Sequence, residues 1–238
     1  VKEQQKAAAP QAAEIDPALT AGFVAVAAGD GVQQLFRDLG VQQIVSGGQT
    51  MNPSTEDILH AAEQVPAMDV YVLPNNKNIV MAAEQAARLA RTSGVRRIHV
   101  VPTTTIPQGI SAMMAYDESA EIKDNVEAMQ EAAEHVQSGS VTFAARDSDY
   151  DGHQIHEGEL LALENGKVAF TGTDLGSVTA KVAKDLMQED SQFITLLYGA
   201  DVSEEQAADV EEAVRSLLPE EVELTVAYGG QPVYYFLI

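Results

Sequence analysis

Between Gly22 and Val101 the chain alternates short runs of apolar, β-branched residues with stretches of helical periodicity. Strands that alternate with helices of about 10–15 residues predict βαβ units and a parallel sheet. The runs are almost wholly apolar, as expected for strands covered on both faces. The expected elements are strand 22–29, helix 30–40, strand 42–48, a helix starting near 52–54, strand 70–74, helix 78–90 and strand 96–102.

The pattern changes after the helical segments that continue to about residue 136. Alternating residues predict a strand over 140–147, and a strand–turn–strand unit follows over 154–170. Asn165-Gly166 is a type I′ hairpin signal within that unit. The remaining expected elements are a helix over 177–187, strand 193–199 and a helix after Ser203 that opens with a capping box to Gln206. The segments VELTVAYGG (222–230) and PVYYFLI (232–238) close the chain.

We therefore predict the α/β fold class with two lobes. A parallel-sheet α/β subdomain spans residues 21–136, and a mixed α+β subdomain spans residues 137–238. Residues 1–20 are rich in Ala and Gln and begin with Val1, so we interpret them as a linker from missing upstream domains.

Charge and composition exclude several function classes. The chain has 36 Asp and Glu against 14 Lys and Arg, a net charge of −22, which disfavours nucleic acid and anionic membranes as partners. No apolar run approaches the roughly 18 residues of a membrane span, and the N-terminus lacks a signal-peptide pattern. The absence of Cys excludes disulfides, thiolate nucleophiles and Cys-ligated zinc. These features favour a cytoplasmic location.

Three polar loops follow the second, third and fourth expected strands. In an open parallel sheet such loops gather at the carboxyl edge, where α/β proteins bind ligands, and helix N-termini there offer unpaired N–H groups to anions. The candidate ligand-binding residues are Ser46, Gly47, Gly48, Gln49, Thr50, Asn52, Ser54, Asn75, Asn76, Lys77, Asn78, Thr103, Thr104, Thr105 and Gln108.

Local turn chemistry is the alternative explanation for these loops. Asn52-Pro53 suits a helix N-cap with Pro at the first helical position, and Gly47-Gly48 suits a tight turn. Lys77, the only basic residue in the loops, could pair with a phosphate or carboxylate or be simply solvated. The loops match neither a P-loop nor the dinucleotide-binding fingerprint.

No catalytic residue and no metal site is predicted. The five His lack zinc-binding spacing, and no Ser lies in a nucleophile-elbow context. Asp147, Asp149 and Asp151 resemble part of a calcium loop, but the offsets of Gly and Glu favour a turn. The acidic run 201–223 is interpreted as a solvated helix face or a docking surface. A small basic cluster consists of Arg88, Arg91, Arg96 and Arg97.

The loops also carry a resemblance to a known family. The motifs VSGGQTMNPSTEDIL (45–59), LPNNKNIVMAAEQAA (73–87) and VPTTTIPQGISAM (101–113) resemble the C-terminal domain of fatty acid kinase A proteins. That family is also described as dihydroxyacetone-kinase-like or as a DAK-type phosphatase. The resemblance covers nearly everything after residue 20.

The resemblance implies a fragment of a larger kinase. In that family a separate helical domain binds ATP and Mg²⁺, so no cofactor is expected in this chain. The complex phosphorylates a fatty acid held by a DegV-like fatty-acid-binding protein, and the acyl phosphate enters phospholipid synthesis. The C-terminal domain is expected to have the two-lobed fold of that partner. The resemblance transfers no catalytic residue to this chain.

Three functions remain open at this point. The first is a non-catalytic domain that docks the DegV-like protein in protein–protein interaction. The second is a small-molecule or anion-binding site at the strand edge, either regulatory or with residual kinase or phosphatase activity. The third is a structural dimerisation module, with a possible homodimer. We expect the chain alone to be inactive in phosphoryl transfer, which needs bridging metal ions and a phosphate cradle.

Overall fold

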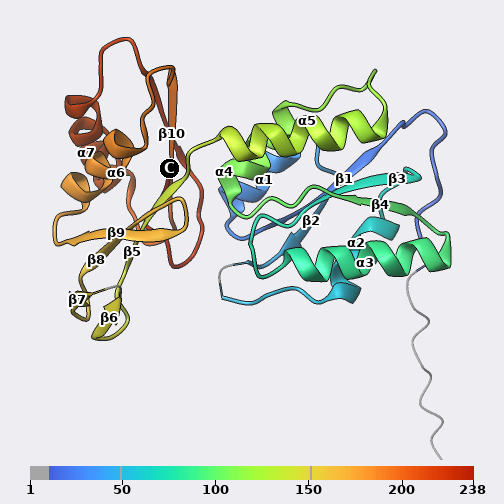
Figure 1. The fold of residues 1–238 in the computed structure, drawn as a ribbon, viewed down its shortest axis with the longest axis horizontal. Helices are drawn as coiled ribbons and strands as arrows, with labels where there is room; N and C mark the ends of the chain where they lie inside the picture. The colour runs from blue at the N-terminus through green and yellow to red at the C-terminus, as the bar shows by residue number, and fades with distance from the viewer. Residues whose placement is uncertain (1–10, 49, 151) are drawn as a thin grey trace, which may run out of the picture.

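Two lobes lie along the long axis of the molecule (Figure 1), in a computed structural model that describes residues 11–48, 50–150 and 152–238. The first lobe contains a parallel sheet, and the second contains a mixed sheet with two helices. The predicted two-lobed α/β class is therefore confirmed. Among the described residues, no helix combines the length and apolar content needed to cross a membrane.

Lobe 1, residues 21–136, is built on a four-stranded parallel sheet in the order β2-β1-β3-β4. Its strands are β1 (Gly22–Ala27), β2 (Gln43–Ser46), β3 (Asp69–Leu73) and β4 (Arg97–Val100). Its helices are α1 (Asp30–Asp38), α2 (Thr55–Glu63), α3 (Val80–Ser93), α4 (Ile106–Met114) and α5 (Ile122–His135).

Alternate residues of β1 supply the cores on both faces of this sheet. Phe23 and Ala25 belong to the core formed with α1, α4 and α5, whereas Val24 and Val26 belong to the core formed with α2 and α3. All four side chains are buried. Double coverage explains why the strand sequence is continuously apolar.

Lobe 2, residues 137–238, contains a six-stranded sheet in the order β11-β10-β12-β5-β8-β9. The β10–β11 pair is parallel, and the other pairs are antiparallel. Its elements are β5 (Gly139–Phe143), β8 (Leu160–Glu164), β9 (Lys167–Gly172), α6 (Leu175–Leu186), β10 (Phe193–Tyr198), α7 (Glu204–Leu217), β11 (Glu223–Tyr228) and β12 (Phe236–Leu237).

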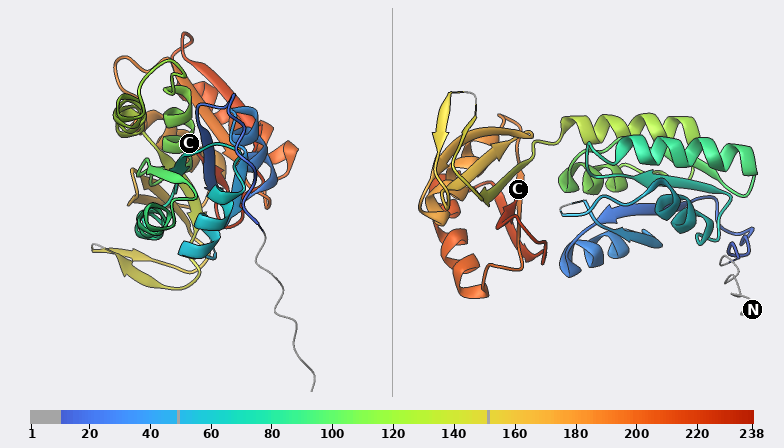
Figure 2. Two further views of the ribbon diagram at one scale, coloured as in Figure 1. Left: turned by 90° about the vertical axis from the view of Figure 1, so that its right-hand side faces the viewer. Right: turned by 90° about the horizontal axis from the view of Figure 1, so that it is seen from below.

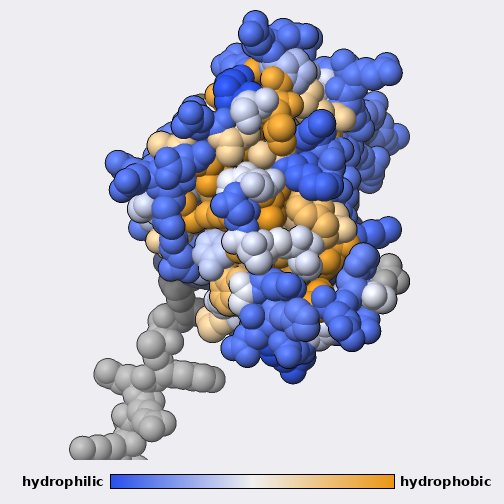
Figure 3. Space-filling model, turned by 90° about the vertical axis from the view of Figure 1, so that its left-hand side faces the viewer, coloured by the Kyte–Doolittle hydropathy of each residue, from blue (hydrophilic) through white to orange (hydrophobic). Residues whose placement is uncertain are grey.

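The two faces of the lobe 2 sheet have different partners. Helices α6 and α7 share one core with it. At this end of the molecule, hydrophilic side chains surround a central band of hydrophobic ones (Figure 3). On the other face, Leu197, Tyr234 and Leu237 pack into the core of α1, α4 and α5 in lobe 1. The contact between the lobes is therefore part of a continuous hydrophobic core.

A separate two-stranded ribbon was not anticipated from the sequence. Strands β6 (Ser148–Tyr150) and β7 (His153–Ile155) pair with each other and join neither main sheet. The ribbon projects from lobe 2 (Figures 1 and 2). The strand expected over 140–147 ends at Phe143. Most residues of the ribbon are exposed and do not alternate between apolar and polar, so the sequence pattern did not predict that β6 and β7 pair.

Local sequence signals predicted some turns and helix ends correctly and one helix end wrongly. The capping box of Ser203 and Gln206 is confirmed, and Asn165 and Gly166 both have positive φ, as a type I′ turn requires. The predicted cap at Asn52-Pro53 is wrong. Ser54 caps α2 instead, because its hydroxyl accepts from the N–H of Asp57 and the Asp57 carboxylate accepts from the N–H of Ser54.

Residues 11–20, expected to belong to a linker, lie against lobe 1. The N–H of Ala13 donates to the carbonyl of Glu63 at 2.9 Å, and the N–H of Asp16 donates to the carbonyl of Pro66 at 2.8 Å. The guanidinium of Arg96 also donates to the carbonyl of Ala13 at 2.6 Å. The other half of the expected linker, residues 1–10, lies outside the described residues.

Asp69 gives the stability of lobe 1 a pH dependence. Its carboxylate accepts from Arg97 at 2.6 Å and lies 2.9 Å from Nε2 of His99, and these partners, Arg97 foremost, lower its pKa. The resulting stability is present above the ordinary carboxyl pKa of about 4 and is lost as pH falls through the lowered pKa.

We expect Asp69→Asn to lower the free energy of unfolding at pH 7 by about 1–2 kcal/mol, since Arg97 is exposed. The difference from the parent protein should shrink as the pH falls below the ordinary carboxyl pKa of about 4 and through the lowered pKa of Asp69. Urea unfolding between pH 2 and pH 7 measures this, with the exposed Asp124→Asn of α5 as the control. A difference that persists unchanged at low pH would contradict the assignment.

Candidate functional site

A cavity of about 710 Å³ lies between the carboxyl edge of the lobe 1 sheet and lobe 2. This volume falls within the roughly 300–1,000 Å³ range of small-molecule sites. We call it the interlobe cleft. Its lining consists of Asn75, Asn76, Lys77, Asn78, Thr104, Thr105, Ile106, Pro107, Gln108, Ser138, Gly139, Ser140, Tyr150, Leu163, Asn165, Gly166, Lys167, Tyr234 and Leu237.

The wall after β3 is held in place by buried Asn75. Its side-chain amide donates to the carbonyl of Val26 at 3.0 Å, and its side-chain carbonyl accepts from the Thr103 hydroxyl at 2.8 Å. Asn75 has a φ of 55°, a conformation that Asn tolerates better than most residues. A side chain at Gly109 would collide with Asn75, so Gly109 allows α4 to approach this loop.

The wall after β4 is organised by the N-terminus of α4. The Thr105 hydroxyl accepts from the N–H of Gln108 as the N-cap, and Oε1 of Gln108 accepts from the N–H of Thr104 at 2.7 Å. The positive end of the α4 dipole therefore faces the cleft, where it favours a negatively charged group.

The wall from lobe 2 was missed by sequence reasoning. The Ser138 hydroxyl lies 3.1 Å from the Thr105 hydroxyl, and the backbone N–H of Ser138 donates to Oδ1 of Asn165 at 3.1 Å. The Asn165-Gly166 turn then carries Lys167 into the lining. The Asn-Gly signal predicted the turn itself, but nothing local to it indicated that a cleft lies beside it.

The cleft has a distinct electrostatic character. None of the described residues that line it is Asp or Glu, although the chain has 36 acids, and Lys77 and Lys167 are both present. No salt bridge joins either lysine to a described carboxylate. The cleft is therefore a local cationic site on a protein of net charge −22.

Two nearby acidic groups resist ionisation. Burial raises the pKa of the Tyr234 phenol, which lines the cleft and stays neutral. Glu164 lies between the lining residues Leu163 and Asn165, and burial followed by the neighbouring Asp185 raises its pKa.

The structure brings together only some of the predicted ligand-binding residues. The lining includes Asn75, Asn76, Lys77, Asn78, Thr104, Thr105 and Gln108. Thr103 is buried behind it, bound to Asn75. Ser46, Gly47, Gly48, Thr50, Asn52 and Ser54 are not part of the lining, and Gln49 lies outside the described residues.

The position of β2 explains why the first loop is separate. The sheet order is β2-β1-β3-β4, so β2 lies two places from β3 and three from β4, whereas the loops after β3 and β4 are neighbours. Polar groups of the first loop are used internally: Ser46 accepts from the Gln33 amide at 2.9 Å, and Ser54 caps α2. One hydrogen bond still connects the first loop to the cleft lining, because the Asn76 amide donates to the carbonyl of Gly48.

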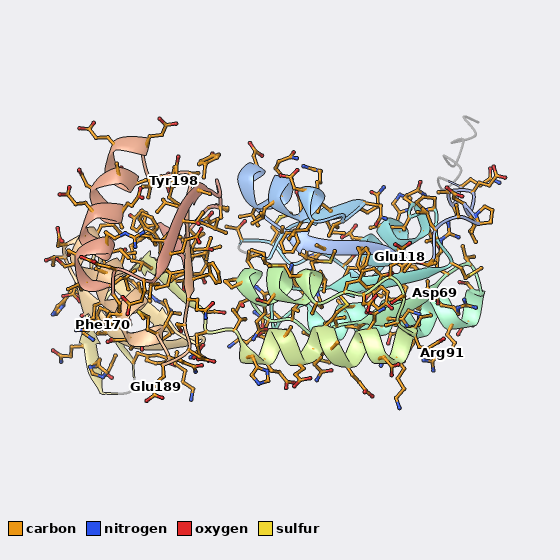
Figure 4. All side chains as sticks on the ribbon, turned by 90° about the horizontal axis from the view of Figure 1, so that it is seen from above. Asp69, Arg91, Glu118, Phe170, Glu189 and Tyr198 are labelled. Atoms are coloured by element: carbon orange, nitrogen blue, oxygen red, sulfur yellow. The ribbon has the colours of Figure 1, made fainter. Side chains whose placement is uncertain are left out.

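Other sequence candidates lie away from the cleft. Arg91 lies at the end of lobe 1 remote from lobe 2 (Figure 4). Asp149 accepts from the backbone N–H of Gly152 three residues on, as in a turn, whereas Asp147 accepts from that of Glu157 ten residues on. Asp151 lies outside the described residues. Among the described residues, no cluster of three or more potential metal ligands occurs.

Fold and site together define the class of protein: a two-lobed α/β protein with a ligand-sized cleft between a parallel sheet and a mixed one. Its family follows from the sequence. The model of the FakA-like C-terminal family, the C-terminal region of proteins similar to fatty acid kinase A, matches residues 22–238, and the chain belongs to this family.

Curated relatives are longer than this chain. Protein YloV of Bacillus subtilis is 40% identical over 217 residues, which cover 91% of this chain and 38% of that protein. An uncharacterized protein of Staphylococcus haemolyticus is 42% identical over 215 residues, 90% of this chain and 38% of its own length. The chain thus spans about two fifths of the length of these relatives.

Solved structures of DegV-family proteins share the fold. The DegV family protein Cg2579 of Corynebacterium glutamicum superposes with a TM-score of 0.66 at 13% identity, covering 92% of this chain and 96% of that one. A DegV family protein of Thermus thermophilus, described as fatty acid binding, gives a TM-score of 0.58 at 16% identity. The match covers 92% of this chain and 99% of that one. The predicted DegV-like architecture is confirmed.

These structures correct one expectation. The chain was expected to be a C-terminal fragment of fatty acid kinase A itself, in a dihydroxyacetone-kinase-like or DAK-phosphatase family. That identification is wrong, because the chain matches DegV-family structures over 92% of its length and over 96–99% of theirs. In its fold the chain is itself a DegV-like protein.

Proposed function

We propose that this chain is a recognition domain that receives the anionic head group of an acyl ligand in its interlobe cleft. In this proposal the ligand is carried by a DegV-like fatty-acid-binding protein, which docks on the chain. The observation that carries the proposal is the absence of Asp and Glu among the described lining residues, together with the presence of Lys77 and Lys167.

The chemistry of the lining suits an amphipathic anion. Lys77, Lys167 and the N-terminus of α4 favour negative charge, and several side-chain amides and hydroxyls provide hydrogen-bond donors. Leu163, Tyr234 and Leu237 add apolar surface beside them. A fatty acid or acyl phosphate combines such a head group with an apolar chain.

The comparisons support the acyl class of ligand. The family model concerns a region similar to fatty acid kinase A, and DegV-family structures of the same fold are described as fatty acid binding. Because the described lining offers no carboxylate to hold Mg²⁺, we propose that ATP, Mg²⁺ and phosphoryl transfer belong to a different region or polypeptide.

We expect Lys77→Gln and Lys167→Gln each to weaken binding of oleate by about tenfold, as loss of a charge-assisted hydrogen bond does. Isothermal calorimetry at 50 mM and 150 mM salt, with free oleate below its aggregation concentration and with an oleate-loaded DegV-family protein, measures both interactions. Lys123→Gln is the matched control, since Lys123 is exposed on α5 and does not line the cleft.

The control variant should bind as the parent does. If neither oleate nor the loaded protein binds at tens of micromolar, or if both cleft variants bind like the parent, the proposal fails. Light scattering on the same samples reports whether the chain forms a homodimer instead.

A small anion alone is the second candidate ligand. The Thr105 cap and the adjacent Ser138 hydroxyl favour it, because they place hydroxyl groups at a helix N-terminus. Titration with inorganic phosphate separates the candidates: binding of phosphate without any binding of oleate would favour the small anion.

A further inference from the structure

A short stretch of chain joins the two lobes and passes beside the interlobe cleft. It runs from the end of α5 at His135 to the start of β5 at Gly139 (Figure 1). Within it, Ser138 is 6% exposed and lines the cleft, and Gln137 precedes it. We call residues 136–138 the interlobe connection. Its conformation affects how the cleft walls from the two lobes face each other.

Asn165 holds this connection from lobe 2. Its Oδ1 accepts from the backbone N–H of Ser138 at 3.1 Å, and its Nδ2 donates to Oε1 of Gln137 at 2.9 Å. The backbone N–H of Asn165 also donates to the carbonyl of Ser138 at 2.7 Å. A type I′ turn requires only a residue that tolerates positive φ, so the two bonds of the carboxamide are additional to what the turn needs.

Ser138 is held from lobe 1 by a pair of hydroxyl groups. Its Oγ lies 3.1 Å from Oγ1 of Thr105, which is the N-cap of α4. A chain of hydrogen bonds therefore runs from Asn165 in lobe 2 through Ser138 to Thr105 in lobe 1. All three residues line the cleft. We call these three residues the interlobe bridge.

The bridge also restrains the position of Lys167. Asn165 and Gly166 have φ values of 48° and 81°, and Glu164 pairs with Lys167 across the two-residue turn. Such a tight turn leaves little freedom between Asn165 and the backbone that carries Lys167. Because Asn165 is bound to the interlobe connection, this backbone is held in place relative to Lys77 and α4 on the opposite wall.

We propose that Asn165 is a positioning residue for the interlobe cleft, an inference that rests on the function proposed above. It acts through Ser138 and Lys167: its carboxamide places the cationic turn of lobe 2 opposite the polar loops of lobe 1, so that one anionic group contacts both walls. A site whose walls are already in place avoids the cost of ordering them when the ligand binds. Removal of the carboxamide should therefore reduce affinity.

Asn165→Gly tests the carboxamide separately from the turn, because Gly adopts positive φ readily and the backbone bond to Ser138 remains. We expect oleate binding in isothermal calorimetry to weaken about fivefold, and hydrogen exchange at the N–H of Ser138 to accelerate.

Asn165→Asp is the conservative variant. Its carboxylate can accept the same hydrogen bond from the N–H of Ser138, so exchange there should return toward the parent rate. Its negative charge beside Lys167 should keep oleate binding weak. The two variants together separate the hydrogen bond from the charge of the cleft.

Ser191→Gly is the matched control. Oγ of Ser191 accepts from the N–H of Gln188 at 2.9 Å, and the N–H of Ser191 donates to the carbonyl of Gln188 at 3.1 Å. Asn165 makes the same pair of bonds to Ser138, but Ser191 does not line the cleft. This variant should exchange faster at Gln188 and bind oleate as the parent does.

A purely structural role would lower the free energy of unfolding in urea for Asn165→Gly and leave oleate binding within twofold of the parent. That result, with weaker binding by Lys167→Gln, would overturn the positioning role and retain the cleft. If the parent binds no oleate, the function proposed above fails and hydrogen exchange alone judges Asn165. An unchanged rate at Ser138 in Asn165→Gly then overturns its role, whereas a faster rate that Asn165→Asp reverses supports it.

Discussion

Arg96→Gln is expected to lower the free energy of unfolding by about 3 kcal/mol or more. Arg96 is only 3% exposed, and its guanidinium donates to four backbone carbonyls, those of Val65, Val95, Ala13 and Glu63. Glutamine is too short and has too few donors to replace these bonds. Each buried carbonyl left without a donor costs about 1–3 kcal/mol.

The same substitution should release the N-terminal segment. Because Arg96 holds the carbonyl of Ala13, hydrogen exchange at the N–H groups of Ala13 and Asp16 should accelerate in the variant. Urea unfolding measures the stability loss, with Arg88→Gln as the control on the exposed surface of α3. Equal stability of the two variants would show that the four carbonyls find other donors, and would contradict this role for Arg96.

Gly31→Ala is expected to destabilise the protein by about 2–3 kcal/mol and to loosen the contact between the lobes. Gly31 is the second residue of α1, and a Cβ there would collide with the backbone carbonyl of Tyr228 in lobe 2. The N–H of Val32 also donates to the carbonyl of Gly229 at 2.9 Å across the same contact. Backbone atoms cannot yield as a flexible side chain does, so overpacking is costly.

Gly176→Ala is the matched control for this prediction. Gly176 is likewise the second residue of a helix, α6, but a Cβ there would meet only the Cβ of Ala213 at 3.3 Å and, further away, a carboxylate oxygen of Asp174. We expect Gly176→Ala to lower the free energy of unfolding only slightly, because the better helix propensity of Ala partly offsets the closer contact. Thermal unfolding compares the two variants, and ligand titration reports the cleft, since its walls come from both lobes. Similar melting temperatures for both variants would argue against tight packing at Gly31.

The order and type of the main elements followed from local signals. Continuous apolar strands indicated a sheet covered on both faces, and β1 is buried on both. The Ser203 capping box and the Asn165-Gly166 turn are local interactions between residues close in sequence, so they could be read directly. The β6–β7 ribbon lacks such signals and was missed.

The sequence predicted only part of the candidate site. The loops after β3 and β4 were predicted to meet because parallel strands share a carboxyl edge, and both line the cleft. The loop after β2 was included by the same rule, but the strand order places β2 two positions from β3 and three from β4. Strand order depends on long-range packing, which a local pattern does not encode.

The sequence by itself determined the acidic surface, the two-layered coverage of the first sheet and the polar loops at its carboxyl edge. Only the tertiary structure decided that Lys167, ninety residues beyond Lys77, lines the same cleft, and that Arg96 is buried rather than part of a basic surface cluster. The physical reason is that periodicity and caps are set by near neighbours, whereas a cleft and a buried guanidinium are created when the lobes and the N-terminal segment pack together.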